Sequence, residues 1–309
     1  MMTDQPFIQC ENLVKIYKIE DIEVVALQGL DLTVESGELA AIIGPSGSGK
    51  SSLLNILGGL DFPSAGKAQV GDVDLVRMND ADRIRYRRKT AGFVWQNVSR
   101  NLIPYLNALE NVEMPMILSG VFDKGRAKEL LDVVGLKDRM RHLPSGMSGG
   151  EQQRVAIAIG LANKPSVLLA DEPTGSLDTA NRDHLLRVFD DVRRQLGVTI
   201  VIVTHDRDMA KAVDRYVEIR DGKTSREAVR RSDDLLLSGP GSSGADGWEE
   251  EYKREADTHE VYTLLDSAGR LQIPGEVLAT HGIRDRVILT EEDDRIVISA
   301  PKKTEDDTS

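Results

Sequence analysis

A glycine-rich loop that contains one lysine is the clearest chemical motif of the sequence. Residues 44–51 have the pattern Gly-x-x-x-x-Gly-Lys-Ser, between an apolar run at 40–43 and a helical pattern at 52–57. Glycines let backbone N–H groups curl around phosphate oxygens, and the following helix directs its partial positive charge at them. Lys50 adds a full charge, and the Ser51 hydroxyl is placed to hold Mg²⁺. The motif predicts a nucleotide phosphate site with these contacts: Gly44, Ser46, Gly47, Ser48, Gly49, Lys50, Ser51 and Ser52.

Two acidic residues follow a second apolar run. Residues 166–170 are typical of a buried parallel strand, and they lead directly into Asp171 and Glu172. Beside a phosphate loop, Asp171 would hold Mg²⁺ through water, and Glu172 would polarise the attacking water as a general base. The two carboxylates therefore predict different roles in one hydrolytic site.

A histidine ends a third apolar run, at 198–204. Ligands of an open α/β sheet bind at the carboxyl ends of its parallel strands, so His205 is a candidate for the nucleotide site. A single histidine at a strand end can equally be structural. The residues alone leave both interpretations open.

Tyr17 and Gln96 each have a chemical and a structural interpretation. The Tyr17 ring could stack on adenine, or it could be a half-exposed strand tyrosine. Gln96 ends a short apolar strand pattern at 91–95, and its amide oxygen could reach Mg²⁺ or the attacking water. A polar residue that simply ends a strand is the alternative.

Residues 148–151 begin a helix in a way that suits two purposes. Ser148 and Glu151 have the spacing of a capping box, in which each side chain satisfies a backbone N–H group of the other. Gly149 and Gly150 also leave N–H groups open to an anion at a helix N-terminus. A second phosphate contact is therefore a physically reasonable alternative to capping alone.

The remaining pattern supplies an α/β framework for these motifs. Alternating apolar and polar residues at 7–17 and 24–34 predict an antiparallel pair of strands before the phosphate loop. Helical patterns occur at 80–88 and at 123–134, and a loop at 97–115 leads into a short helix.

Composition limits the class of protein. The chain has 309 residues, 40% of them hydrophobic, enough for two domains with a sizeable core. No apolar run approaches the ~18 residues of a membrane span, and we expect no secretion signal. The single cysteine, Cys10, excludes an intrachain disulfide, and a net charge of −12 argues against general nucleic-acid binding.

The order and spacing of these motifs, with residues 176–178, resemble the ATP-binding cassette (ABC) ATPase family over about residues 7–224. Within it, residues 108–112 and 169–178 look most like the ATPase subunits of macrolide-exporter and lipoprotein-release transporters. The resemblance implies an α/β P-loop ABC ATPase domain with an antiparallel β subdomain and a helical subdomain. It also implies ATP and Mg²⁺ as cofactors, a homodimer, and a separate transmembrane permease subunit, with the chain peripheral on the cytoplasmic face of the cell membrane.

The same resemblance assigns a role to each candidate residue. It implies that Tyr17 stacks on adenine and that Ser148, Gly149, Gly150 and Glu151 belong to the signature sequence, which completes the ATP site of a partner chain. It places Asp178 in a dimer-contact loop and makes His205 the switch histidine that senses the γ-phosphate. The implied catalytic residues are Glu172, His205 and Gln96, and the implied metal ligands are Ser51, Gln96 and Asp171.

The C-terminal part differs in character. We expect the ATPase domain at 1–224, a flexible linker at 225–257, a small domain at 258–300 and a disordered tail at 301–309. Short strand patterns occur at 261–265, 271–273, 287–290 and 295–299.

Residues 266–274 and 281–285 resemble AbrB/MazE-type swapped-hairpin domains, in which two chains interleave into one small barrel. Such domains often bind DNA, but residues 258–309 hold eleven acidic and six basic residues, a net charge of −5. Dimerisation is therefore favoured over DNA binding. An ATP-sensing regulator or a non-transport ABC ATPase whose C-terminal domain binds DNA is the alternative to a transporter subunit.

Overall fold

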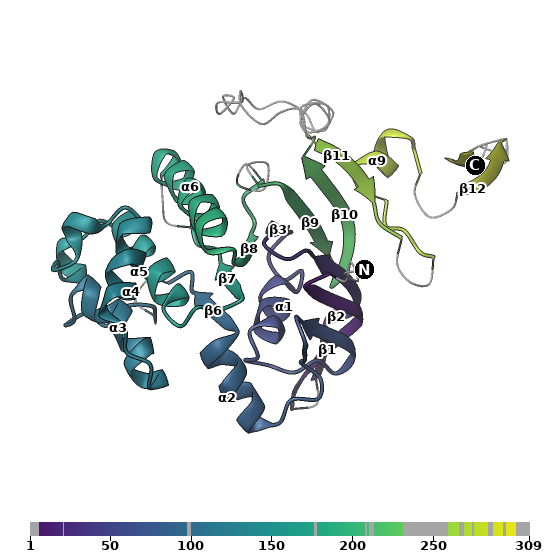
Figure 1. Ribbon diagram of the computed structural model, residues 1–309. Helices are drawn as coiled ribbons and strands as arrows, with labels where there is room; N and C mark the ends of the chain where they lie inside the picture. The colour runs from purple at the N-terminus through teal and green to yellow at the C-terminus, as the bar shows by residue number, and fades with distance from the viewer. Residues whose placement is uncertain are drawn as a thin grey trace, which may run out of the picture.

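The computed structural model describes residues 6–20, 22–97, 100–175, 178–207, 209, 213–230, 259–265, 269–273, 275–283, 287–292 and 295–300. Figure 1 shows a central sheet flanked by helices, a second sheet beside it and a helical lobe on the opposite side. The central sheet has seven strands in the order β11-β10-β9-β3-β8-β7-β6. The predicted α/β class is confirmed.

Five strands of the central sheet are parallel, and three of them form its buried middle. These are β3 (Leu39–Ile43), β8 (Thr199–Thr204) and β7 (Val167–Asp171). Nearly every residue of the three is buried, which explains their unbroken apolar sequences. The parallel neighbours are β6 (Ala91–Val94) and β9 (Arg215–Arg220).

A four-stranded antiparallel sheet has the order β2-β1-β4-β5. Its strands are β1 (Ile8–Ile19), β2 (Ile22–Val34), β4 (Ala65–Val70) and β5 (Val73–Asp74). The first two are the predicted antiparallel pair, with Ile8 opposite Val34. Helix α1 (Lys50–Leu57) packs against both sheets, since its buried leucines share one core with Leu13 and Val201.

The helices form the rest of the ATPase part. Their bounds are α2 (Asp80–Lys89), α3 (Ala108–Ser119), α4 (Lys124–Val133), α5 (Gly149–Leu161) and α6 (Thr179–Leu196), with 3₁₀ turns at η2 (Lys137–Arg139) and η3 (Pro144–Gly146). In Figure 1, α3, α4 and α5 make the helical lobe, away from β1 and β2. Among the described residues, no helix combines the length and apolar composition that crossing a bilayer requires.

The structure corrects the expected start of the linker. Strand β10 (Lys223–Arg230) extends six residues into the segment that we expected to be flexible. Strand β11 (His259–Thr263) pairs antiparallel with it, so the first strand expected for the C-terminal domain lies at the edge of the central sheet instead. Burial explains the difference, because Ala228 on β10 and His259 on β11 are both at most 1% exposed.

The chain beyond β11 has little regular structure among its described residues. Leu271, in the expected strand 271–273, makes only an isolated bridge with Leu265. Helix α9 (Gly275–Thr280) follows, and β12 (Ile288–Glu292) pairs antiparallel with β13 (Arg295–Ser299). Residues 231–258 and 301–309 lie outside the described residues, so the swapped-hairpin domain and the boundaries around it stay predictions.

Candidate functional site

The phosphate loop lies between β3 and α1, and close packing requires two of its glycines, Gly44 and Gly49. Gly49 has φ +100°, and a Cβ there would collide with the carbonyl oxygen of Ala26 at the β2 strand. A Cβ at Gly44 would collide with the carbonyl oxygen of Ile219 on β9. The backbone of the loop is thus held tightly on two sides, which leaves its N–H groups in a fixed arrangement.

Lys50 and Ser48 show that this loop suits an anion. Lys50 is 6% exposed, and its Nζ donates to the carbonyl oxygens of Gly44 (2.7 Å) and Pro45 (2.9 Å). The buried hydroxyl of Ser48 has no hydrogen-bond partner among the described residues, and α1 has no side-chain cap at Gly49. Phosphate oxygens would satisfy the hydroxyl, the helix N-terminus and the lysine together.

Asp171 lies at the end of β7 beside this loop. Burial and the neighbouring Glu172 raise the pKa of Asp171, whereas Lys50 and a hydrogen bond from Ser51 act in the opposite direction. Burial lowers the pKa of Lys50, and the two carboxylates oppose that shift. The described residues contain no cluster of three or more His, Cys, Asp or Glu that could hold a metal unaided. The assignment of Ser51 and Asp171 as Mg²⁺ ligands stays a prediction.

Glu172 and His205 meet at the ends of two neighbouring strands. The Nδ1 atom of His205 lies 2.8 Å from Glu172 Oε1, and the Thr204 hydroxyl donates to Oε2 at 3.2 Å. Glu172 itself has φ +46°, which is unusual for a residue with a side chain. Its N–H donates to the carbonyl oxygen of Val203 at 2.8 Å, so both its backbone and its carboxylate are fixed by β8.

Gln96 and Tyr17 lie next to other parts of the same site. A Cβ on Gly175 would be 3.3 Å from Gln96 Nε2, so this side chain contacts the turn that follows Glu172. The Tyr17 hydroxyl donates to Asp61 Oδ2 at 2.9 Å and lies 3.3 Å from the Ser52 hydroxyl of α1. Both residues are therefore near the phosphate loop or the carboxylates, although their proposed contacts with ATP and Mg²⁺ stay predictions.

The capping box at the start of α5 is confirmed. The Ser148 hydroxyl accepts from the N–H group of Glu151 at 3.3 Å, and Glu151 Oε2 accepts from the N–H group of Ser148 at 2.8 Å. These bonds lower the pKa of Glu151. Ser148 and Gly149 are exposed, so a further contact with an anion stays open.

Asp178 is the N-cap of α6. Its two carboxylate oxygens accept from the backbone N–H and the side-chain amide of Asn181, each at 2.9 Å, and these bonds lower the pKa of Asp178. A Cβ on Gly150 would be 3.2 Å from Asn181 Oδ1. The starts of α5 and α6 are thus neighbours, while Ser176 and Leu177 of the predicted contact loop lie outside the described residues.

Comparison with known proteins identifies the family. The family model described as "ABC transporter" matches residues 27–175. The lipoprotein-releasing system ATP-binding protein LolD of Bacteroides thetaiotaomicron is 47% identical over 204 residues, which are 65% of this chain and 93% of that protein. The chain belongs to the ABC transporter ATP-binding protein family. The predicted family, and with it ATP hydrolysis coupled to transport, is confirmed.

Two further relatives extend this result. The macrolide export ATP-binding/permease protein MacB of Rhodopseudomonas palustris is 41% identical over 274 residues, 86% of this chain but only 41% of that protein. The solved dimeric structure of the ATP-binding cassette MJ0796, in a post-hydrolysis state with ADP and Pi, has a TM-score of 0.64 and 39% identity. It covers 71% of this chain and 97% of that one.

Thr204 is a site residue of this ABC ATPase that sequence reasoning missed. Its hydroxyl contacts Glu172 across 32 positions of the chain. The only available signal was its place at the end of β8, directly before His205. Asp61, the partner of Tyr17, carried no signal at all, because it lies in a connection without a motif.

Proposed function

We propose that two copies of this chain form two composite ATP sites, each with the phosphate loop of one copy and residues 148–151 of the other. The exposed, capped start of α5 supports the proposal, because Ser148 and Gly149 are not covered by their own chain. The relative MJ0796 was solved as a dimer with ADP and Pi. ATP binding would bring the two halves together, and hydrolysis would let them part.

The proposed chemistry depends on the closeness of three side chains, those of Glu172, His205 and Lys50. Mg²⁺, held through Ser51, Asp171 and Gln96, neutralises phosphate charge when bound. Lys50 and the loop N–H groups bind the β- and γ-phosphates. Glu172 accepts the proton of the attacking water, and His205 holds Glu172 Oε1 while it faces the γ-phosphate.

A direct test is phosphate release by the purified full chain with Mg²⁺ and ATP. The wild-type chain should hydrolyse ATP, and Lys50→Ala should fail at nucleotide binding, because the loop loses its only charged phosphate ligand. Unchanged ATP affinity in Lys50→Ala would contradict the assignment of the loop.

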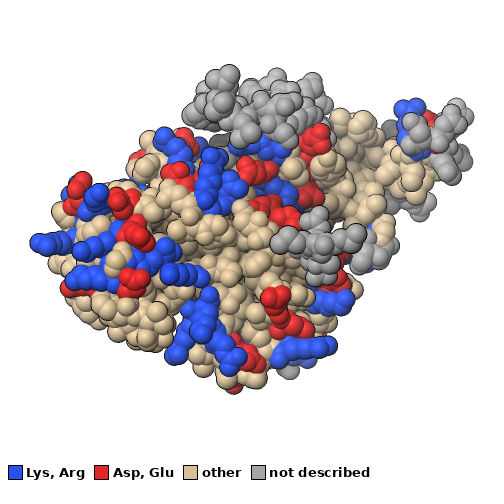
Figure 2. Space-filling view, viewed as in Figure 1, with Lys and Arg blue, Asp and Glu red and all other residues tan. Residues whose placement is uncertain are grey.

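The transmembrane partner would dock in a groove between α2 and the helical lobe. The groove has a volume of about 570 Å³, with Met116 and Val121 among its apolar residues and Arg85, Arg88 and Arg126 among its basic ones. Figure 2 shows basic side chains gathered over this part of the surface. Arg126 Nε is buried without a hydrogen-bond partner among the described residues. We therefore propose that an acidic, amphipathic cytoplasmic helix of a separate permease binds there, with the chain peripheral at the cytoplasmic face.

Charge reversal tests the groove. Arg85→Glu with Arg88→Glu should abolish co-purification of a polytopic membrane protein and leave basal ATPase activity intact. Arg77→Glu is the matched control, since Arg77 is also basic and is 87% exposed outside the groove. Retained co-purification in the double variant would contradict this docking site.

The chain after β11 would hold the two ATPase halves together. On β12 and β13, Ile288 is 45%, Leu289 65% and Ile296 73% exposed, and adjacent strand residues face opposite sides of a sheet. A two-stranded hairpin with apolar residues on both faces is marginal by itself, so a second copy of the swapped-hairpin type would cover it.

Truncation after Leu265 tests this proposal, because it keeps β10 and β11. The full chain without nucleotide should sediment as a dimer and the truncated chain as a monomer. A monomeric full-length chain would contradict the proposed dimer domain and favour the DNA-binding alternative.

A further inference from the structure

Helix α6 is joined to the loop after β8 by an ion pair. Arg182, in the first turns of the helix, donates from Nη1 to Asp206 Oδ2 at 3.2 Å, and the two side chains are 16% and 30% exposed. The other oxygen of Asp206 accepts from the N–H group of Met209 at 3.3 Å. Both carboxylate oxygens of Asp206 are therefore engaged, one by helix α6 and one by the N–H group of Met209.

The same loop holds the carboxylate of Glu172. The N–H group of Asp206 donates to the Thr204 hydroxyl at 3.0 Å, and this hydroxyl donates in turn to Glu172 Oε2 at 3.2 Å. His205 contacts the other oxygen of Glu172 at 2.8 Å. A continuous path of polar contacts therefore runs from Arg182 through Asp206 and Thr204 to the proposed base.

The backbone of Glu172 is also in an unusual conformation at this point. Its backbone adopts φ +46°, a conformation that surrounding contacts must maintain. A base that is misplaced by about 1 Å can lose on the order of a hundredfold in rate, because proton transfer requires close alignment.

We propose that Arg182 is a positioning residue for ATP hydrolysis, which acts through Asp206 on the loop that orients Glu172 and His205. This inference rests on the proposed roles of Glu172 and His205. Arg182 lies one turn after Asp178, the N-cap in the predicted dimer-contact loop. A dimer contact at the start of α6 would thus reach the proposed base through the Arg182–Asp206 ion pair and the two hydrogen bonds of Thr204.

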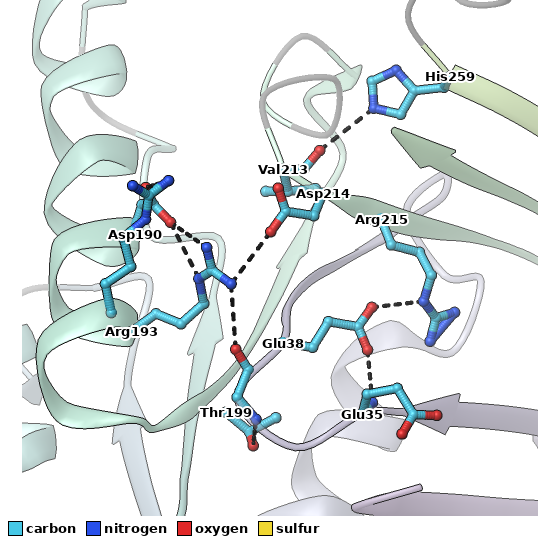
Figure 3. Close-up of polar contacts among 11 residues, drawn as sticks. Glu35, Glu38, Asp190, Arg193, Thr199, Val213, Asp214, Arg215 and His259 are labelled. Carbon is cyan, nitrogen blue, oxygen red and sulfur yellow. Dashed lines mark hydrogen bonds and ion pairs between the residues drawn. The ribbon is translucent and has the colours of Figure 1, made fainter. Parts of the chain in front are cut away.

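The test compares two arginines of α6. The partner of Arg182 is connected to Glu172, whereas Arg193 has other acidic partners. Arg193, near the other end of α6, is 21% exposed and pairs with Asp190 at 2.7 Å and with Asp214 at 3.5 Å (Figure 3). Arg182→Met should lower kcat on the order of tenfold and leave the Kd for ATP within about twofold, because phosphate binding does not use the path. Arg193→Met should lower the melting temperature without changing kcat.

Two further variants separate positioning from folding. Arg182→Lys should recover part of kcat, because an ammonium group can still pair with Asp206. Asp206→Asn should lower kcat, and its combination with Arg182→Met should be no worse than the more severe single variant. All rates are measured well below each melting temperature.

The outcomes distinguish this inference from the proposed function. Wild-type kcat in Arg182→Met, an equal loss in Arg193→Met, or additive losses in the double variant would each overturn the positioning role. If the wild-type chain does not hydrolyse ATP, or if Lys50→Ala keeps its ATP affinity, the proposed function itself fails.

Discussion

The two ends of helix α6 carry similar interactions with different consequences. Near its start, Arg182 pairs with Asp206, and two hydrogen bonds through Thr204 connect Asp206 to the carboxylate that is proposed to be the base. Near its end, Arg193 pairs with Asp190 and Asp214 and donates to the carbonyl oxygen of Gly37 at 3.5 Å (Figure 3). The first network ends at the nucleotide site, whereas the second ends at strands of the framework.

The second network includes a further arginine next to Asp214, at the starts of the neighbouring strands β9 and β3. Arg215 pairs with Glu38 at 2.7 Å, and the Nε2 of His259 lies 3.4 Å from the carbonyl oxygen of Val213 (Figure 3). Arg215 also pairs with Glu227 on β10, at 2.5 Å. We expect an arginine ion pair to contribute to rate or to stability according to what its partner contacts next. Variants at each network should therefore separate the two quantities.

The largest effect should come from Glu172→Gln, at the end of the first network. The amide cannot accept the proton of water, so turnover should fall by about 10²–10⁴-fold while ATP still binds. Phosphate release and nucleotide affinity measure the two quantities, and melting temperature serves as the control. Near-normal turnover would show that Glu172 is not the base. The first network would then lead only to a structural residue.

The second network should respond to Arg215→Met through stability. The Arg215 side chain is 13% exposed, and its loss leaves Glu38 and Glu227 without their partner, so we expect a loss of about 3 kcal/mol in unfolding free energy. Turnover at low temperature should be unchanged. Arg194→Met is the control, since Arg194 is 63% exposed and its pair contributes little. Reduced turnover in a still-folded Arg215→Met chain would show that the second network also affects rate, and would contradict the proposed difference between the two networks.

The variant Ser148→Asp separates stability from turnover at the start of another helix, α5. Asp caps a helix as well as Ser, so the melting temperature should be preserved. An added negative charge that faced the γ-phosphate across the dimer would repel ATP, and we expect turnover to fall at least about tenfold. Parallel loss of stability and turnover would instead limit Ser148 to its capping role.

The smallest expected effect is on the rate at which Cys10 is alkylated, which measures how readily the fold opens. Burial raises the pKa of Cys10 to about 12, so its thiol stays protonated and shielded from alkylation at pH 8. The wild-type and Arg182→Met chains should label equally slowly, and Arg215→Met should label faster. Fast labelling of Arg182→Met would show that its loss of turnover follows from unfolding.

The sequence predicted the chemical groups of the site because they lie inside continuous motifs. Asp171, Glu172 and His205 each follow an apolar run, and the carboxyl ends of neighbouring parallel strands must meet at one edge of the sheet. The contact between Arg182 and Asp206 was not predictable in this way. It joins residues 24 positions apart, and neither lies in a pattern that specifies a partner.

The correction at β10 and β11 has a similar cause. The short strand pattern at 261–265 indicated a strand, and the structure places a strand at His259–Thr263. A period of two shows that one face of a strand is buried, but it does not show which strand lies beside it. The pairing of β11 with β10 is decided by buried residues such as Ala228, which local sequence does not reveal.

Mixing two inactive variants tests directly whether each ATP site takes residues from two chains. Lys50→Ala loses its own phosphate loop, and Ser148→Asp loses the surface that it offers to a partner. In a mixed dimer, one site combines both defects and the other combines the intact loop with the intact Ser148. With composite sites, the mixture should hydrolyse ATP well above the rate of either variant alone. A mixture that is no more active than the separate variants would contradict the composite site.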